Sequence, residues 1–219
     1  MSFDKQKAEA SKKNLENADL QNADLQEADL SEGILIEACL ENCNLSEADL
    51  CGADISGASL KNARLHRTVL YRCRGKEVDF SNTILTQANL VEANLSGANF
   101  THANLMESNI EGANLTDTCF KNANLSEANL TGVFLANANL SGANFTNSEC
   151  IAADFAGCDL TGANLHNTYI NHADLSGANL KSTLNLTRDQ VETAFINKQT
   201  LLTDSIPIVW ISKTEYEFE

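Results

Sequence analysis

Four histidines and seven cysteines are the residues of this chain with the widest chemistry, since such side chains bind metals and act as nucleophiles or general bases. Their spacing supports neither role. The cysteines are odd in number and form neither a paired Cys-x-x-Cys zinc motif nor a disulfide framework. Phosphate-binding loops, serine-hydrolase elbows and His-Glu-x-x-His motifs are also absent from the sequence. We therefore expect reduced thiols, no cofactor, no metal and no catalytic residue, and hence a protein that is not an enzyme.

A five-residue repeat determines where these side chains stand. From Leu15 to Leu180 every fifth residue is Leu, Ile or Phe, with Gly75 and Cys150 as the two exceptions. A small residue, most often Ala, nearly always lies two positions earlier, and Asp or Asn commonly lies between, as in Ala18-Asp19-Leu20. A period of five fits neither the 3.6 of a helix nor the 2.0 of a strand. We expect each unit to form one side and one corner of a four-sided coil, with the small and large apolar residues inward.

A second period, of twenty residues, supports this geometry. Phe80, Phe100 and Phe120 recur at that interval, and so do several asparagines, namely Asn22, Asn42, Asn62, Asn82 and Asn122. Residues twenty apart should therefore stack, because aromatic and amide ladders favour identical neighbours and Asn tolerates tight turns. The repeat predicts about eight and a half coils and a rod about 40 Å long at the usual strand spacing.

Both exceptions to the repeat are interpreted as packing. Cys150 lies between Phe145 and Phe155, and Gly75 precedes Phe80, so a large neighbour on the adjacent side should restore the lost volume. Gly75 could also mark a bulge or kink in the coil.

The coil separates the residues with the widest chemistry. His66 and His166 share a side but lie five coils apart, about 24 Å, which is too far for one metal ion. His102 falls on another side. His172 falls at a corner near His166, where the coil offers no third ligand of suitable type. Three cysteines should be inward and compact, namely Cys43, Cys73 and Cys158, and three outward, namely Cys39, Cys51 and Cys119.

The net charge of the chain restricts the kinds of partner that it can bind. Thirty acidic residues against fifteen basic ones give a net charge of −15, which repels nucleic acid and anionic membranes but attracts a basic protein surface. No apolar run approaches the roughly 18 residues that a membrane-spanning helix needs, and the N-terminus does not resemble a secretory signal. We expect a cytoplasmic protein.

The charge is unevenly distributed along the repeat. Residues 14–60 hold eleven Asp or Glu and no Lys or Arg, whereas residues 61–76, named here the basic coil, hold six cations. The basic coil is a candidate partner contact through Arg64, Arg67, Val69, Tyr71, Arg72, Arg74 and Lys76. The alternative is charge relief, because Arg67 falls in a corner row with Glu47 and Glu107. Further outward apolar residues are Ile34, Ile84, Phe134 and Tyr169.

The repeat from Leu15 to Leu180, with its unit Ala-(Asp/Asn)-Leu-x-x, resembles the pentapeptide-repeat protein family. That resemblance implies an all-β fold, a right-handed quadrilateral β-solenoid. The terminal coils of such a rod expose backbone donors and apolar core, so we also expect a short helical or extended C-terminal cap. We expect residues 1–13 to form an N-terminal arm or cap, with a preference for a short helix. Residues 14–183 should form the solenoid, and residues 184–219 a cap helix and tail.

The C-terminal cap has its own sequence signals. Thr187 and Gln190 have capping-box spacing and precede Val191, Ala194 and Phe195 at helical intervals, so a helix through these residues should cover the last coil. The run from Ile206 to Ile211 should be extended. It either completes the cap or forms a homodimer contact, and the residues concerned are Val191, Phe195, Ile206, Ile208 and Trp210.

We therefore expect a non-enzymatic interaction or scaffold module that presents rigid solenoid sides to a protein partner whose identity the sequence does not give. The resemblance also suggests an alternative, since some pentapeptide-repeat proteins protect or inhibit DNA gyrase by imitating DNA, as in fluoroquinolone resistance. The acidic rod favours that alternative. The Ala, Asn and Leu character of the repeat and the basic coil disfavour it, because the resistance proteins have repeats rich in Cys and Phe.

Overall fold

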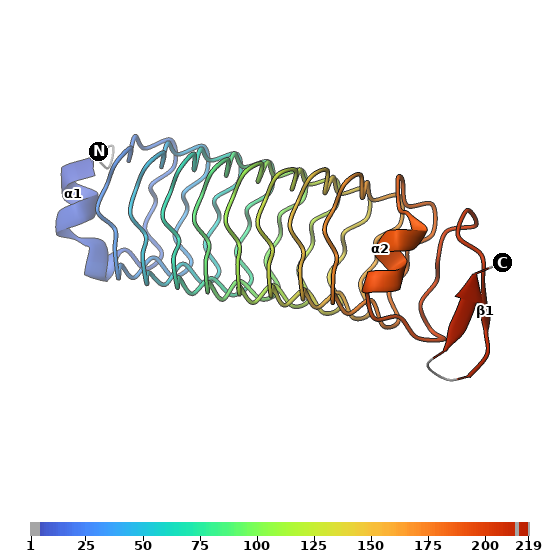
Figure 1. Ribbon diagram of the computed structural model, residues 1–219. Helices are drawn as coiled ribbons and strands as arrows, with labels where there is room; N and C mark the ends of the chain where they lie inside the picture. Colours follow the sequence, from blue (N-terminus) through green and yellow to red (C-terminus); the bar gives the residue numbers. More distant parts are fainter. Residues whose placement is uncertain (1–4, 213–214, 219) are drawn as a thin grey trace.

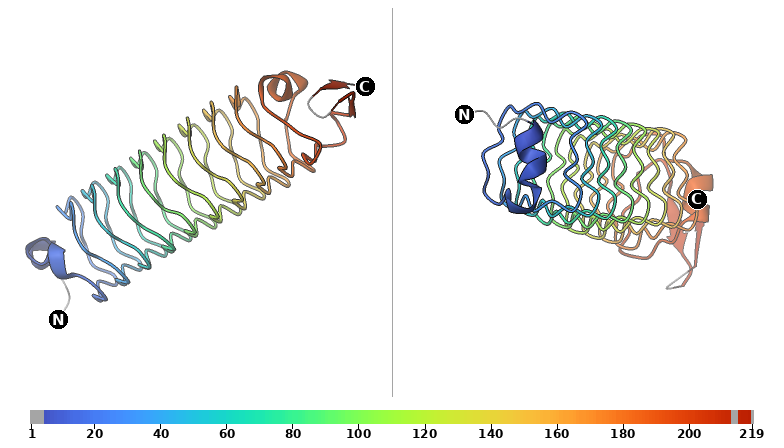
Figure 2. Two further views of the ribbon diagram at one scale, coloured as in Figure 1. Left: turned by 90° about the horizontal axis from the view of Figure 1, so that it is seen from below. Right: turned by 90° about the vertical axis from the view of Figure 1, so that its left-hand side faces the viewer.

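The protein is a straight rod of stacked coils with a helix at each end (Figure 1). The computed structural model describes residues 5–212 and 215–218, without the side chain of Trp210. Helix α1 (Lys5–Ala10) and a short 3-10 helix (Lys12–Asn14) precede the first coil. Helix α2 (Arg188–Thr193) and the strands β1 (Ile208–Trp210) and β2 (Tyr216–Phe218) lie at the other end. Two further views show the same coils from below and from the α1 end (Figure 2).

Parallel backbone pairing between residues twenty apart holds the coils together. Asp24 pairs with Asn44, which pairs with Arg64, and the same interval repeats on every side. The Leu25 N–H donates to the Asn44 carbonyl at 2.7 Å, and the Asn44 N–H donates back to Ala23 at 3.0 Å. Each side therefore contributes only a short extended stretch before the chain turns, which is why the pairing forms isolated bridges and no long strand.

We name the four sides after their outward residues, those directly before each inward centre. Sides A, B, C and D carry, in successive coils, Ile34, Asp54 and Arg74; Cys39, Ser59 and Asp79; Asn44, Arg64 and Ile84; and Asp49, Val69 and Asn89. Because each row is continuous, the surroundings of any outward residue are set by the residues twenty before and after it.

Every corner turns through a residue with a left-handed backbone, two positions after the centre. Asn22 has a φ of 61° and Gly57 a φ of 68°, as the turn chemistry of these residue types predicts. The same conformation is forced on residues with no preference for it, such as Glu27 at 56°, Arg67 at 57° and Ala152 at 53°. The stacking of coils therefore overrides local backbone preference at the corners.

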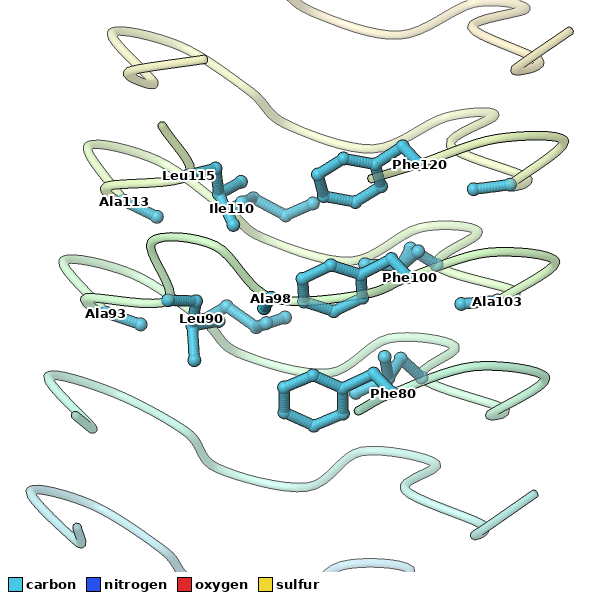
Figure 3. Packing of buried hydrophobic residues seen from close by; sticks show 14 of the residues in the cluster. Phe80, Leu90, Ala93, Ala98, Phe100, Ala103, Ile110, Ala113, Leu115 and Phe120 are labelled. Carbon is cyan, nitrogen blue, oxygen red and sulfur yellow. The ribbon is translucent and has the colours of Figure 1, made fainter. Parts of the chain in front are cut away.

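The inward residues form one continuous column. The rings of Phe80 and Phe100 are 4.7 Å apart and 7° from parallel, and those of Phe100 and Phe120 are 4.6 Å apart and 2° from parallel. Figure 3 shows this pile beside Leu90 and Leu115. All three phenylalanines are fully buried. The stacking expected from the twenty-residue period is confirmed.

At Gly75 the space of the missing side chain is filled from the coils above and below. A Cβ atom there would lie 2.6 Å from Leu95 and 3.0 Å from Ile55. The ladder through Arg74 is unbroken, and the Gly75 N–H donates to Asn94 at 2.8 Å, so the expected bulge or kink is wrong. The volume is restored along the rod, since both Leu95 and Ile55 are twenty residues away.

Cys150 behaves as expected of a compact inward residue. It is fully buried, and the neighbouring centres Phe145 and Phe155 meet edge to face at 6.0 Å across the coil. The aromatic pair therefore supplies volume beside a side chain smaller than Leu.

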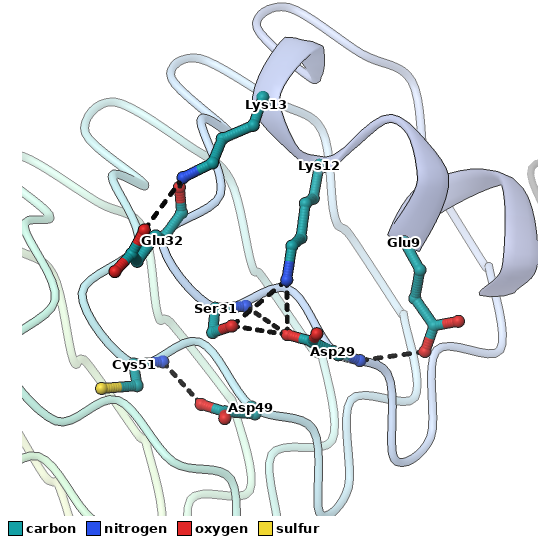
Figure 4. A network of polar contacts seen from close by, with 8 residues as sticks. All are labelled: Glu9, Lys12, Lys13, Asp29, Ser31, Glu32, Asp49 and Cys51. Atoms are coloured by element: carbon teal, nitrogen blue, oxygen red, sulfur yellow. Dashed lines mark hydrogen bonds and ion pairs between the residues drawn. The ribbon is translucent and has the colours of Figure 1, made fainter.

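At the N-terminal end, polar contacts join α1 and the 3-10 helix to the first coils (Figure 4). Glu9 accepts the backbone N–H of Asp29 at 3.0 Å, and the Lys12 ammonium lies 2.7 Å from the Asp29 carboxylate. The hydrogen bond from Lys12, with those from Ser31, holds the pKa of Asp29 well below its ordinary range. Ala8 of α1 is fully buried. The helix expected within residues 1–13 is present at Lys5–Ala10; residues 1–4 lie outside the described part.

At the C-terminal end, the capping box forms as predicted. Thr187 accepts the Gln190 N–H at 3.3 Å, and the Gln190 side chain accepts the Thr187 N–H at 2.8 Å. The helix ends at Thr193, so the expectation that it continues through Phe195 is wrong. The Phe195 N–H instead donates to Ala173 at 2.8 Å, because the edge of the last full coil needs backbone partners.

The ladders continue past the repeat on three sides. Leu184, Phe195 and Leu201 pair with Asn164, Asp174 and Asn179, on sides C, A and B. On side D, α2 takes this place: its Gln190 amide donates to the carbonyls of Leu165 at 3.0 Å and Thr168 at 2.8 Å. The buried Val191 side chain comes from the same helix.

The segment expected to be extended contains β1, which pairs antiparallel with β2 through Ile208 and Phe218. Ile206 is buried and Ile208 is half-buried. The Trp210 backbone belongs to β1, but the contact expected of its side chain lies outside the described residues.

Candidate interaction surfaces

The cysteines divide into inward and outward groups as predicted. Burial raises the pKa of Cys73 to about 12 and that of Cys43 to about 11. The Cys43 thiol donates to the Leu20 carbonyl at 2.8 Å, so it behaves as a core side chain. Cys39, Cys51 and Cys119 are half-buried and carry free thiols.

Two of the histidines contact side chains other than His. His66 lies 2.8 Å from the Thr86 hydroxyl, its neighbour one coil above, and the ring of His172 lies 6.4 Å from that of Phe195. Within residues 5–212 and 215–218, no group of three or more His, Cys, Asp or Glu side chains could hold a metal ion. In the same part of the chain, no helix is long and apolar enough to cross a membrane.

Most of the outer surface is a regular amide and carboxylate lattice. On side C, Asn124 donates to Asn104 and Asn144 donates to Asn124, each at 3.1 Å. The same oxygens accept the backbone N–H two residues later, as Asn144 does from Thr146 at 3.2 Å. Because these side chains satisfy one another, a partner must displace existing hydrogen bonds to bind there. Departures from the lattice are therefore the candidate contacts.

Within the basic coil, three of the cations have acidic partners. Arg72 lies 2.6 Å from Glu92, Arg74 lies 3.2 Å from Asp54, and Lys76 lies 3.4 Å from Glu77. The first two pairs join residues twenty apart, so the stacking itself sets them. Five of the six side chains are well exposed and that of Asp54 is partly buried, so the pairs cancel charge but contribute little stability.

The other cations of the basic coil, Lys61, Arg64 and Arg67, have no ion pair within 4.0 Å in the part of the chain that the structure describes. Arg64 borders a groove of about 400 Å³ on side C, with His66 and Ile84 in its wall. The charge relief expected of Arg67 is not seen as a direct contact with Glu47, although both are on the same corner row.

The seven residues proposed from the sequence do not meet at one point. Arg64 is on side C, Val69 on side D and Arg74 on side A, so the set wraps around three sides. Two of the seven do meet: the Arg72 guanidinium lies 4.8 Å above the Tyr71 ring, which fixes the ring against the surface.

The outward apolar residues Ile34, Ile84, Phe134 and Tyr169 are exposed, and Tyr169 is the most exposed, at 57%. A second exposed set lies near the end of the rod, and sequence reasoning named Phe195 of this set but missed Leu184 and Leu201. The residues that close the ladders there, Leu184, Phe195 and Leu201, are also exposed and apolar. The signal was present, because all three replace the usual Asp or Asn, but their register is visible only once the coil is seen to continue past Leu180.

A larger groove, of about 830 Å³, lies between side D and α2. Tyr169 and Ile170 contribute from the coil, and Thr187, Asp189 and Gln190 from the helix region. The groove exists because α2 replaces one side of the final coil.

Comparison with known proteins was made by family and by structure. The sequence model of the family described as pentapeptide repeats matches eight copies of its repeat, within residues 6–35, 14–46, 35–67, 76–112, 108–147 and 148–184. Curated protein sequences gave no match. HetL, a pentapeptide-repeat protein of the cyanobacterium Nostoc sp. strain PCC 7120 involved in the regulation of heterocyst differentiation, is 28% identical over 84% of this chain and 85% of its own, with a TM-score of 0.78.

A trypsin-treated form of QnrB1, a plasmid-mediated fluoroquinolone resistance protein, is 22% identical over 77% of this chain and 80% of its own, with a TM-score of 0.55. At that identity the likeness concerns the fold alone. Together the family match and these solved structures support a right-handed quadrilateral β-helix, as expected from the repeat.

Proposed function

Since the chain belongs to the pentapeptide-repeat family, we propose that it is a non-enzymatic interaction or scaffold module whose rigid sides bind a protein partner. One observation carries this proposal. The outward rows form a lattice of Asn and Asp side chains that hydrogen-bond to one another. The basic coil interrupts this lattice with exposed cations and with the half-buried Val69 and Tyr71. A surface that departs from a regular lattice at one level of a rigid rod is suited to recognition, because binding there orders no loop.

The ends of the rod belong to the same proposal. We assign residues 1–13 to an N-terminal cap, residues 14–183 to the solenoid and residues 184–219 to a C-terminal cap and tail. Buried Val191 and Ile206 support the capping role, because they cover the end of the apolar column. Phe195, Ile208 and Trp210 are proposed as the part of this end that meets a second copy, supported by the 60% exposure of Phe195. A cytoplasmic location, consistent with the free thiols, completes the assignment.

The test is capture of a partner from the native cell extract at physiological salt, followed by reconstitution with the purified partner. Replacing Val69 by Asn and Tyr71 by Thr restores the regular lattice, and this variant should lose about tenfold or more in affinity. Ile151→Thr is the matched control, since Ile151 occupies the same row as Tyr71 outside the basic coil, and it should bind as the wild type does. Failure to capture any partner, together with turnover of a small substrate by the purified chain, would contradict the proposal.

A second candidate function is imitation of DNA towards gyrase or a related topoisomerase. The observation in its favour is the first stretch of the rod, residues 14–60, with eleven carboxylates and no cation in a chain of net charge −15. Such binding should weaken steeply with salt, as DNA binding does. A supercoiling assay with purified gyrase, with and without a fluoroquinolone, tests it. Protection or inhibition at micromolar protein supports the imitation, and no effect at that concentration removes it.

A further inference from the structure

The unpaired cations of the basic coil all belong to one side of the rod. Arg64 is the outward residue of side C, and Lys61 and Arg67 stand at the two ends of the same side. We name these three residues the positive patch. The paired cations lie elsewhere on the coil: Arg72 at the corner between sides D and A, Arg74 on side A, and Lys76 at the corner after side A.

The residues in the rows above and below explain why the three cations of the positive patch form no ion pair. Arg64 stacks between Asn44 and Ile84, neither of which is acidic. The carboxylate in the Lys61 row is Glu41, and it already accepts hydrogen bonds from Ser59 at 2.9 Å and Gln21 at 3.3 Å.

Two more carboxylates near side C are similarly engaged. Asp24 accepts from Asn44 at 3.0 Å, and Glu107 accepts from Gln87 at 2.8 Å. Glu47 differs from these three carboxylates, since it lines the groove beside Arg64 without pairing with a cation. Its charge opposes the positive patch, a cost that can be tested directly.

We propose that side C of the basic coil binds an acidic, extended segment of the protein partner, an inference that rests on the proposed function. A partner carboxylate enters the groove of about 400 Å³ and meets the Arg64 guanidinium, which suits bidentate pairing. Arg67 and Lys61 hold further carboxylates at the two edges of the side. The exposed Ile84 side chain, directly above Arg64, receives an aliphatic residue of the same segment.

The occupant is an acidic polypeptide and not nucleic acid because the positive patch is short. Its three residues lie in one coil, and the acidic neighbours Glu47 and Glu107 in the Arg67 row lie one coil below and two coils above, about 5 Å and about 10 Å along the axis at the usual strand spacing. Along the axis of the rod, acidic coils lie below and above the positive patch, beginning with Glu47 below and Glu107 above. A polyanion charged along its whole length would overlap these coils, whereas a segment of a few residues meets the patch alone.

The test uses a fluorescent nine-residue probe, Gly-Glu-Glu-Leu-Glu-Glu-Leu-Glu-Gly, with its Gln counterpart and an oligothymidylate of equal charge as comparisons. Wild-type protein should bind the acidic peptide saturably and more tightly than either comparison. The double variant Arg64→Gln/Arg67→Gln should weaken binding about tenfold or more. The matched control Arg72→Gln/Arg74→Gln, which removes the same charge from neutralised positions, should weaken it less than about threefold. Arg64→Lys should retain most of the affinity, and Glu47→Gln should raise it about twofold or more.

Equal losses in the two double variants would overturn the inference, because the effect would then be general charge. Tighter binding of the oligothymidylate, or no saturable binding of the peptide up to about 1 mM, would also overturn it. Any of these negative results overturns the inference about side C alone. The proposed function still stands if the captured partner binds the wild type and does not bind the Val69→Asn/Tyr71→Thr variant. Circular dichroism and the urea midpoint of each variant show whether it folds, and the exposed positions of these side chains predict that it does.

Discussion

Replacing Phe100 by Leu tests the aromatic pile quantitatively. Phe100 is stacked on both faces, at 4.7 Å from Phe80 and 4.6 Å from Phe120, whereas each of those rings has one aromatic neighbour in the row. Leu fits the site, because Leu60 and Leu140 occupy the same row in the coils just beyond the pile. Each stacked pair contributes about 0.5–1.5 kcal/mol beyond its buried area. Phe100→Leu should therefore cost about 1–3 kcal/mol from stacking, and Phe80→Leu or Phe120→Leu about half as much.

The assay is equilibrium unfolding in urea, followed by circular dichroism, on the three single variants. The smaller volume of Leu adds a similar cavity cost at all three sites, so the difference between Phe100→Leu and the two controls isolates one stacked pair. A loss at Phe100 no larger than at Phe80 and Phe120 would refute the continuous pile. A larger loss, by about 0.5–1.5 kcal/mol, is the expected result.

Four further predictions follow from the same geometry. Gly75→Ala should destabilise the fold by about 1–3 kcal/mol in urea unfolding, because the added Cβ would lie 2.6 Å from the Leu95 side chain. An unchanged urea midpoint would contradict this, since it would mean that Leu95 moves aside without cost. Ala152→Gly should stabilise by about 0.5–1 kcal/mol in the same assay, because the corner φ of 53° is strained for Ala. Ala136→Gly should destabilise, because Ala136 precedes the left-handed corner residue and does not itself have a left-handed backbone. The stabilising contribution of Asp29 should be fully present above its ordinary pKa of 3.8 and should decline progressively as the pH falls below that value towards the lowered pKa of the folded state. The gap in urea midpoint between wild type and Asp29→Asn should therefore begin to shrink between pH 7 and pH 3, and a constant gap over that range would contradict this. At about pH 8 a disulfide reagent should modify Cys39, Cys51 and Cys119 in the folded protein, and the buried thiols only after unfolding. The reason is that burial raises the pKa of Cys73, Cys150 and Cys158 to about 12. Rapid reaction of Cys73 in the folded state would contradict this.

The repeat made most of the fold predictable, because one five-residue register places every inward side chain. The stacking of Phe80 on Phe100 followed from spacing alone, and the inward places of Cys43 and Cys73 followed with it. Handedness did not follow from spacing, since a square coil of either hand would bury the same residues. It came from the family resemblance.

The errors arose where long-range backbone pairing outweighs local preference. Phe195 stands at a helical interval after Val191, yet its backbone completes the edge of the last full coil, and α2 ends at Thr193. Gly75 could mark a bulge in a single strand, but Leu95 and Ile55 fill its place from adjacent coils. Glu27 and Arg67 adopt left-handed corners that their residue types disfavour, because the turn is imposed by the coils on either side.

The candidate surface was located by composition but resolved only by the structure. Counting charges identified the basic coil, and the twenty-residue rule could have paired Arg72 with Glu92 and Arg74 with Asp54 in advance. It could not have shown that Glu41 is already engaged by Ser59, because that bond depends on side-chain reach. The separation into neutralised and free cations therefore needed coordinates.

We propose that the coils form a rigid column whose sides are fixed surfaces for a partner. A distance measurement between spin labels at Asp24 and Asn164 tests it most directly, in a background with Ser at Cys39, Cys51 and Cys119. Both positions are on side C, seven rungs apart. The column predicts one narrow distance distribution centred near 34 Å, from a spacing of about 4.8 Å per coil. A broad distribution, or a centre displaced by more than about one coil spacing, would contradict the column and the surfaces built on it.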